Sequence, residues 1–126
     1  MKSKLTTTKE ITRDTKEKVL ERQHHRSISG VALPSSAEFH HYIFRSASGV
    51  GFEWNVIALT PEEHRAVHDR QPIKVNGRVR YQPDEFDTLM RNHLIINYSG
   101  WSVENCKYKK YKDEEEYGVV RRDKKL

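Results

Sequence analysis

The sequence predicts a small α+β domain in which two strands and a helix form a central ββα unit flanked by other helices. Three observations lead to this prediction. Aromatic and aliphatic residues gather at 37–44 and again at 53–59, as is typical of strands. The glycine-containing segment 46–51 allows the chain to turn between them. Directly after the second segment, Thr60 and Pro61 form a strong helix start.

Length and composition limit the classes of protein that need to be considered. The 126 residues suffice for one domain and one modest core. A net charge of +5 favours a nucleic acid partner only weakly. No apolar run reaches the roughly 20 residues that span a bilayer, and no secretory signal is expected at the N-terminus. The single cysteine, Cys106, excludes an intramolecular disulfide and a cysteine zinc knuckle, and it fits a cytoplasmic protein.

A helix is expected before the central unit, over residues 14–23. Asp14 or Thr15 can cap its N-terminus. Val19 and Leu20 provide a small apolar stripe that would pack this helix against the strands.

The helix of the central unit carries a complete start signal. Thr60 is a good N-cap and Glu63 completes a capping box with it, so we expect a helix from Pro61 to about Asp69. The Asn-Gly pair within residues 71–83 then indicates a small β-hairpin.

The longest helix is expected to open at Pro83 and Asp84 and to run to Tyr98. It carries a mostly apolar stripe at helical spacing, formed by Phe86, Leu89, Met90, His93, Leu94 and Asn97.

The domain boundaries follow from composition. Residues 1–13 are polar and are expected to form a flexible N-terminus. Residues 14–112 form the single domain, with the ββα unit at about 37–70. Residues 113–126 are expected to be a charged tail, at least partly disordered.

Four of the seven histidines lie within the ββα unit. His64 and His68 are four residues apart on the predicted helix, so their side chains would share one face and could ligate one cation. Taken alone, such a pair is more often a surface feature. His40 and His41 are neighbours on the predicted strand and would point to opposite faces. We therefore expect one of them to face the helix and join a metal site while the other acts as a base.

Together these residues resemble a known family, the HNH or ββα-metal (His-Me finger) endonucleases. The segment "EFHH…WNVIALTPEEHRAVH" is similar to the nuclease domains of DNase colicins, and it also resembles the small HNH proteins of phage genomes. The close likeness covers Glu38–His68, and a looser one begins near Lys16. The resemblance implies a ββα-metal core, and it does not extend to residues 71–126.

The resemblance also implies catalytic roles, one position at a time. His41 matches the general base that activates water. Asn55 matches the residue that braces the loop and so orients the base. Glu38 matches a carboxylate that steadies the site.

One divalent metal ion is implied as cofactor. His40 and His64 match metal ligands, and His68 matches either a third ligand or a phosphate contact. Imidazole nitrogens suit zinc or nickel better than magnesium, whereas many HNH enzymes work with magnesium or manganese. We therefore expect a transition ion to bind tightest, with the activating ion left open among zinc, nickel, magnesium and manganese.

DNA is the implied partner. Arg45 and Arg65 lie close to the motif and could contact phosphate. The segment "KYKKYK" interleaves lysine with tyrosine, which suits phosphate contacts and base stacking, although a solvated tail is an equally good interpretation. The lysines proposed as DNA contacts are Lys107, Lys109 and Lys110.

The chain departs from many family members at the positions of their zinc knuckles. Ser27 and Ser29 stand near the first cysteine pair, and Thr60 and Glu63 stand near the second. Hydroxyls and a carboxylate cannot replace four thiolates, so no structural zinc is expected.

The function expected from the resemblance is endonucleolytic hydrolysis of DNA, by nicking or by cutting both strands. A single site reaches one phosphate, so cutting both strands would need a homodimer or two sequential nicks. A phage or mobile-element nuclease in the host cell cytoplasm is expected, in preference to a toxin nuclease. The alternative is a catalytically idle, metal-supported DNA-binding or phage packaging accessory protein.

Overall fold

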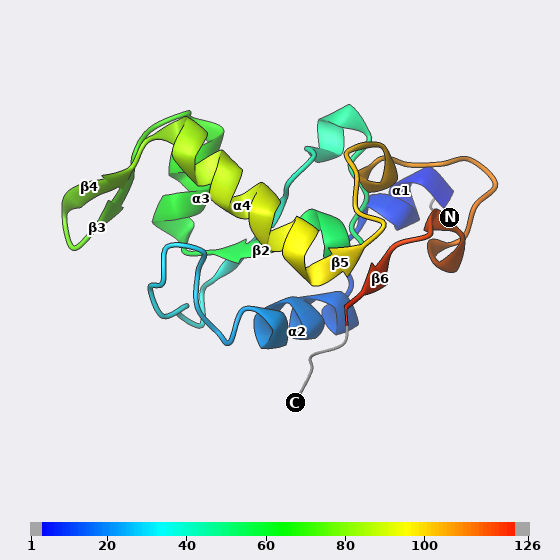
Figure 1. Ribbon diagram of the computed structural model, residues 1–126, viewed down its shortest axis with the longest axis horizontal. Helices are drawn as coiled ribbons and strands as arrows, with labels where there is room; N and C mark the ends of the chain where they lie inside the picture. Colours follow the sequence, from blue (N-terminus) through cyan, green and yellow to red (C-terminus); the bar gives the residue numbers. More distant parts are fainter. Residues whose placement is uncertain (1–3, 123–126) are drawn as a thin grey trace.

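The centre of the fold is a two-stranded antiparallel sheet, and the predicted α+β class is confirmed. The computed structural model describes residues 4–122 (Figure 1). Strand β1 (Glu38–His41) pairs with β2 (Val56–Leu59), so that His40 lies opposite Ile57. Both strands are shorter than predicted. The backbone of the loop between them is hydrogen-bonded to the Asn55 side chain, which ends the ladder early.

Strand β2 is buried on both faces, because helices cover the sheet on each side. Val56 and Ala58 pack against Val19 of helix α2 (Arg13–Arg22), in the stripe predicted from the sequence. The alternate residues of β2, Ile57 and Leu59, join the main core with α4 (Pro83–Asn97). This double burial explains why β2 reads as a continuous apolar run in the sequence.

Helix α2 begins one residue earlier than predicted, and its predicted cap is wrong. Thr12 is the N-cap, with its side-chain oxygen accepting a hydrogen bond from the Thr15 backbone N–H at 3.1 Å. Asp14 instead lies in the first turn, where its charge favours the positive end of the helix.

Helix α3 (Pro61–His68) follows the sequence prediction closely. The Thr60 side chain accepts from the Glu63 backbone N–H, and the Glu63 carboxylate accepts from the Thr60 backbone N–H. This reciprocal capping box satisfies two donors that the helix start would otherwise leave without partners.

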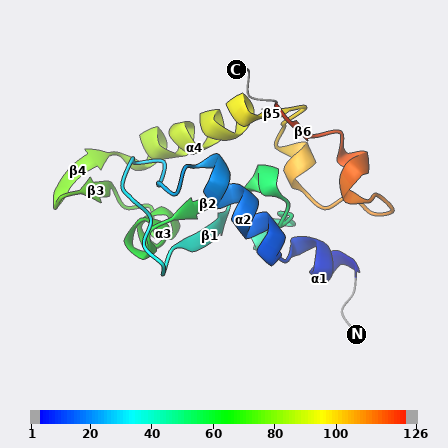
Figure 2. The same ribbon diagram turned by 90° about the horizontal axis from the view of Figure 1, so that it is seen from below.

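The predicted hairpin is confirmed as β3 (Ile73–Val75) paired with β4 (Arg78–Tyr81). Its turn residues Asn76 and Gly77 have φ values of 53° and 77°, and positive φ at both positions is what a two-residue hairpin turn requires. The hairpin projects from one end of the molecule, at the left in Figures 1 and 2. Within residues 4–122, no helix is both long enough and apolar enough to cross a membrane.

Part of the N-terminal segment predicted to be flexible, residues 1–13, forms secondary structure. Lys4–Lys9 form helix α1, and the arm that leaves it crosses the β1–β2 loop. The Gly51 N–H donates to the Thr8 carbonyl at 2.9 Å, and a Cβ added at Gly51 would lie 2.2 Å from the Glu10 carbonyl oxygen. Only glycine allows so close an approach. Residues 1–3 lie outside the described part of the chain.

The predicted charged tail at 113–126 is likewise part of the fold as far as residue 122. Glu114–Tyr117 form a 3-10 turn, and β6 (Val120–Arg121) pairs with β5 (Tyr98–Ser99). Tyr117 is 3% exposed and packs against Phe52. The domain therefore extends beyond both predicted boundaries of 14–112, and residues 123–126 lie outside the described part of the chain.

Candidate metal centre

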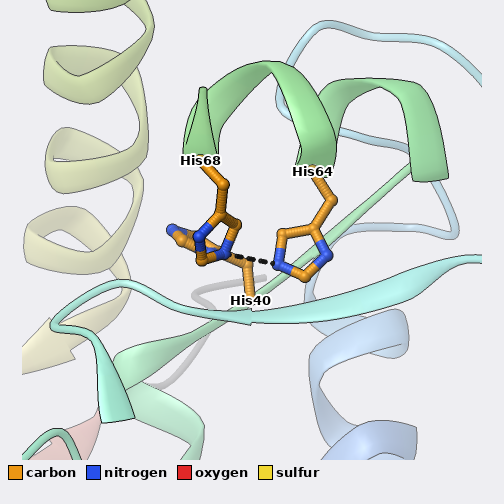
Figure 3. A group of neighbouring side chains, drawn as sticks. All are labelled: His40, His64 and His68. Carbon is orange, nitrogen blue, oxygen red and sulfur yellow. Dashed lines mark hydrogen bonds between the residues drawn. The ribbon is translucent and has the colours of Figure 1, made fainter. Parts of the chain in front are cut away.

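Three histidines from two elements meet between β1 and α3. His64 and His68 project from one face of α3, and His40 projects from β1 toward them (Figure 3). Each offers one ring nitrogen, and these atoms all lie within 4.8 Å of one another. The helical spacing of His64 and His68 and the inward face of His40 thus bring together the three residues predicted to be ligands.

The orientation of His64 is set by Glu38. His64 Nδ1 lies 2.7 Å from Glu38 Oε1, and because a carboxylate only accepts, Nδ1 carries the proton. In the neutral ring this leaves the Nε2 lone pair facing His68, whose Nε2 is 3.1 Å away. Two nitrogens bound tetrahedrally to zinc at about 2.0–2.1 Å would be roughly 3.3 Å apart, so this pair needs little movement to share an ion.

His40 is the most buried member of the cluster, at 1% exposed. Burial, followed by the neighbouring imidazoles of His64 and His68, lowers the pKa of His40 to about 3, so its ring is neutral at pH 7. Within the described residues, Nδ1 has no hydrogen-bond partner. Buried polar atoms normally have one. An orphaned nitrogen beside two other imidazoles fits a transition-metal ion.

His41 faces the other side of β1, as strand alternation predicted. Its Nε2 lies 2.8 Å from the Lys9 backbone carbonyl at the end of α1, so Nε2 donates and the Nδ1 lone pair is left free of this bond. Burial is the main cause that lowers the pKa of His41 below its ordinary value, and the charge of Arg45 acts in the same direction. The hydrogen bond to Lys9 opposes this shift.

Asn55 braces the loop that follows His41. Its side chain is fully buried, with Oδ1 accepting from the Ile43 N–H at 2.8 Å. Nδ2 donates to the carbonyls of Ile43 and Val50. Asn55 thus ties both ends of the β1–β2 loop to the start of β2.

A cavity of about 150 Å³ lies against both the three clustered histidines and His41. His40, His64 and His68 line it together with His41 and Arg45. Phe39 and Phe44 supply its apolar walls, with the Phe44 ring stacked on that of His68 at 4.9 Å. A wider, open groove of about 620 Å³ continues from His41 past Arg45 and Lys16. His41 and the three clustered histidines therefore open into one space.

The residues predicted to contact DNA differ in their position relative to the cavity. Arg45 lies at the site, whereas Arg65 is exposed on α3 and does not line the cavity. Lys107 is 3.6 Å from the Glu104 carboxylate. Lys109 donates to Asn105 and lies over the Tyr117 ring, while Lys110 is exposed over Tyr111. Arg45 is thus the one cation of this set that lines the shared cavity.

Glu63 is the centre of a hydrogen-bonded network that includes Ser27, Ser29 and Thr60. Both Ser27 and Ser29 donate their hydroxyls to the Glu63 carboxylate, which also accepts from the Thr60 N–H. Glu63 is only 5% exposed, so these bonds form away from water. They attach the segment after α2 to the start of α3.

Sequence reasoning missed the Lys9 carbonyl, Phe44 and Lys16. Any residue offers a carbonyl, so no side-chain pattern marks Lys9. Phe44 was assigned to an extended strand, and its position over His68 depends on the turn at Arg45–Ala47. The Lys16 ammonium lies over the Phe39 ring at 5.4 Å, a contact between elements that are distant in the sequence.

Comparisons of the chain with protein-family models, with curated proteins and with solved structures found no match.

Proposed function

We propose that the chain is a metal-dependent HNH endonuclease with a ββα-metal core, which hydrolyses phosphodiester bonds in DNA. One observation carries this proposal. Three histidines are grouped as if to hold one cation, and a fourth, His41, points away from them yet opens into the same cavity. A purely structural metal site would have no need of a separate imidazole beside it.

His41 is suited to act as the general base. Its Nε2–H is held by the Lys9 carbonyl, so the remaining lone pair on Nδ1 can accept a proton. In the proposed reaction a water oxygen forms a bond to phosphorus, and the water proton passes to His41. The bond from phosphorus to the 3′ oxygen breaks, and this oxygen leaves with its electron pair. Asn55 keeps the loop after His41 in place for this step.

His40, His64 and His68 would hold the ion, with Glu38 fixing the tautomer of His64. When bound, the ion would supply positive charge to the scissile phosphate and the leaving oxygen. Three nitrogen donors favour zinc or nickel for tight binding, while magnesium or manganese stay open as activating ions. Arg45, at the rim of the same cavity, is placed to contact a neighbouring phosphate.

The test is cleavage of supercoiled plasmid by metal-stripped, full-length protein. Zinc, nickel, magnesium and manganese are added back separately, and the nicked and linear products are separated on a gel. We expect at least one ion to restore cleavage. A dominant nicked product would indicate one site acting on one strand. If the protein binds an ion but cuts DNA with none of the four, the nuclease proposal is overturned in favour of an idle DNA-binding accessory.

Metal binding is tested separately by titration calorimetry. His64→Ala is expected to remove tight binding, whereas Glu38→Gln should weaken it about 10–100-fold, because the carboxylate that orients the His64 ring is lost. His25→Ala is the matched control, because His25 is an exposed histidine in the loop after α2. Equal affinity in the His64 and His25 variants would show that the cluster is not the metal site.

A further inference from the structure

The hairpin β3–β4 presents an unusual concentration of unpaired positive charge. Its residues from Ile73 to Tyr81 include Lys74, Arg78 and Arg80 and no acidic residue. All three cations are exposed, and within the part of the chain that the structure describes none of them forms an ion pair. We infer that this hairpin binds the backbone of duplex DNA, an inference that rests on the proposed nuclease function.

The arrangement of the side chains on the hairpin favours a groove over a flat surface. Arg78 lies opposite Val75 in the ladder, and its neighbour Val79 points to the other face. Arg80 lies at a shift in the register, so alternation does not assign it to a face. Lys74 lies directly opposite Val79 in the ladder, so it belongs to the other face. Cations thus point to both sides of a two-stranded ribbon. Such a ribbon fits the major groove of B-form DNA, about 12 Å wide, where phosphates line both walls.

This geometry also selects between nucleic acids. The major groove of A-form RNA is deep and narrow and does not admit such an element. Duplex DNA is therefore the partner that we expect. Val79, 52% exposed at the centre of β4, would face the groove together with Lys74.

The hairpin lies beside the proposed site, with helix α3 between them. His64 and His68 face β1, while β3 follows α3 after a short connection and packs against it. Both views place the hairpin at the end of the long axis beyond α3 (Figures 1 and 2). Arg65 is exposed on the helix between the two. A helix is about 10–12 Å across, so a duplex with one phosphate at the site could reach the hairpin within about one groove width.

The test is equilibrium binding of a short fluorescent DNA duplex to full-length protein, followed by anisotropy at several salt concentrations with EDTA present. The variant is Arg78→Gln with Arg80→Gln. The matched control is Arg26→Gln with Arg122→Gln, which removes two exposed arginines from other parts of the surface. Loss of two phosphate contacts should lower the slope of log K against log salt by about 1.8 and weaken binding roughly 10–100-fold at 0.1 M salt. The control should change both quantities much less.

Several outcomes would overturn the inference. One is an equal effect of hairpin and control variants, and another is equally tight binding of duplex RNA of the same sequence. Lys74→Gln serves as a second variant from the opposite face, and it should lower the slope by about 0.9. Because EDTA prevents metal-dependent cleavage, the binding result is independent of the nuclease proposal. If the hairpin variants lose binding while no ion supports cleavage, the hairpin is a DNA-binding element and the nuclease proposal is wrong. If the hairpin variants cleave DNA with an unchanged KM, the nuclease proposal is supported and the inference that the hairpin binds DNA is wrong.

Discussion

Replacing His93 by glutamine should remove a defined part of the pH dependence of stability. His93 Nε2 lies 2.9 Å from Nε of Arg22, and because a guanidinium only donates, the histidine must present a lone pair there. Burial, followed by the charges of Arg22 and Arg121, lowers the pKa of His93 from 6.5 to about 3. Glutamine can offer an oxygen to the same N–H but does not titrate.

The sign and size of the effect follow from proton linkage. In the unfolded chain His93 binds a proton below pH 6.5, whereas in the folded chain it stays neutral until about pH 3. Protons therefore favour the unfolded state, and stability falls as the pH drops through this window. At pH 5, about 1.5 units below the unfolded pKa, the contribution is about 2 kcal/mol. Because the ring is only partly buried, screening brings the expected value to about 1–2 kcal/mol.

The assay is urea unfolding of the wild type and of His93→Gln at pH 7 and pH 5. The loss of unfolding free energy between the two pH values should be about 1–2 kcal/mol smaller in the variant. Other histidines, including the buried His40, are present in both proteins and cancel in the comparison. His24→Gln, at an exposed histidine, is the matched control. If His93→Gln retains the full wild-type dependence, then His93 is not held neutral by Arg22 and burial.

Three further predictions concern the scaffold around the site. Gly51→Ala would place a Cβ 2.2 Å from the Glu10 carbonyl oxygen, so we expect the free energy of unfolding to fall by about 1–3 kcal/mol. Trypsin should also cleave the segment 4–10 faster; an unchanged cleavage rate would argue against the close approach. Asn55→Ala removes the partners of three backbone groups and should cost about 3 kcal/mol in urea unfolding, whereas the exposed control Asn92→Ala should change stability by no more than about 0.5 kcal/mol in either direction. Burial raises the pKa of the Cys106 thiol to about 12, so iodoacetamide at pH 8 should label it only after unfolding; labelling of the folded protein would contradict its burial.

The parts of the fold that could be predicted are those with strong local signals. Thr60, Pro61 and Glu63 define the start of α3 through contacts within four residues. Asn76 and Gly77 define the hairpin in the same way, because few other residues adopt positive φ easily. These signals act before any tertiary contact forms, so the sequence alone reveals them.

The structure of the described segments 4–10 and 113–122 could not be predicted, because it depends on contacts with residues distant in the sequence. The arm after α1 is held by the backbone of Gly51, and Tyr117 is buried by Phe52 and Trp54. Both contacts lie in polar, charged parts of the sequence, where no local pattern predicts burial. The same distinction applies to the site, where spacing predicted the grouping of the histidines on α3. By contrast, the Lys9 carbonyl on His41 follows from the arm and has no local signal.

In the proposed reaction, His41 accepts the proton from water while the other three histidines hold the ion. The most direct test is the rate of plasmid cleavage by His41→Ala, measured at the same bound metal content as the wild type. We expect a rate lower by about 10²–10⁴-fold with metal content unchanged. Cleavage by His41→Ala at the wild-type rate and equal metal content would contradict this expectation.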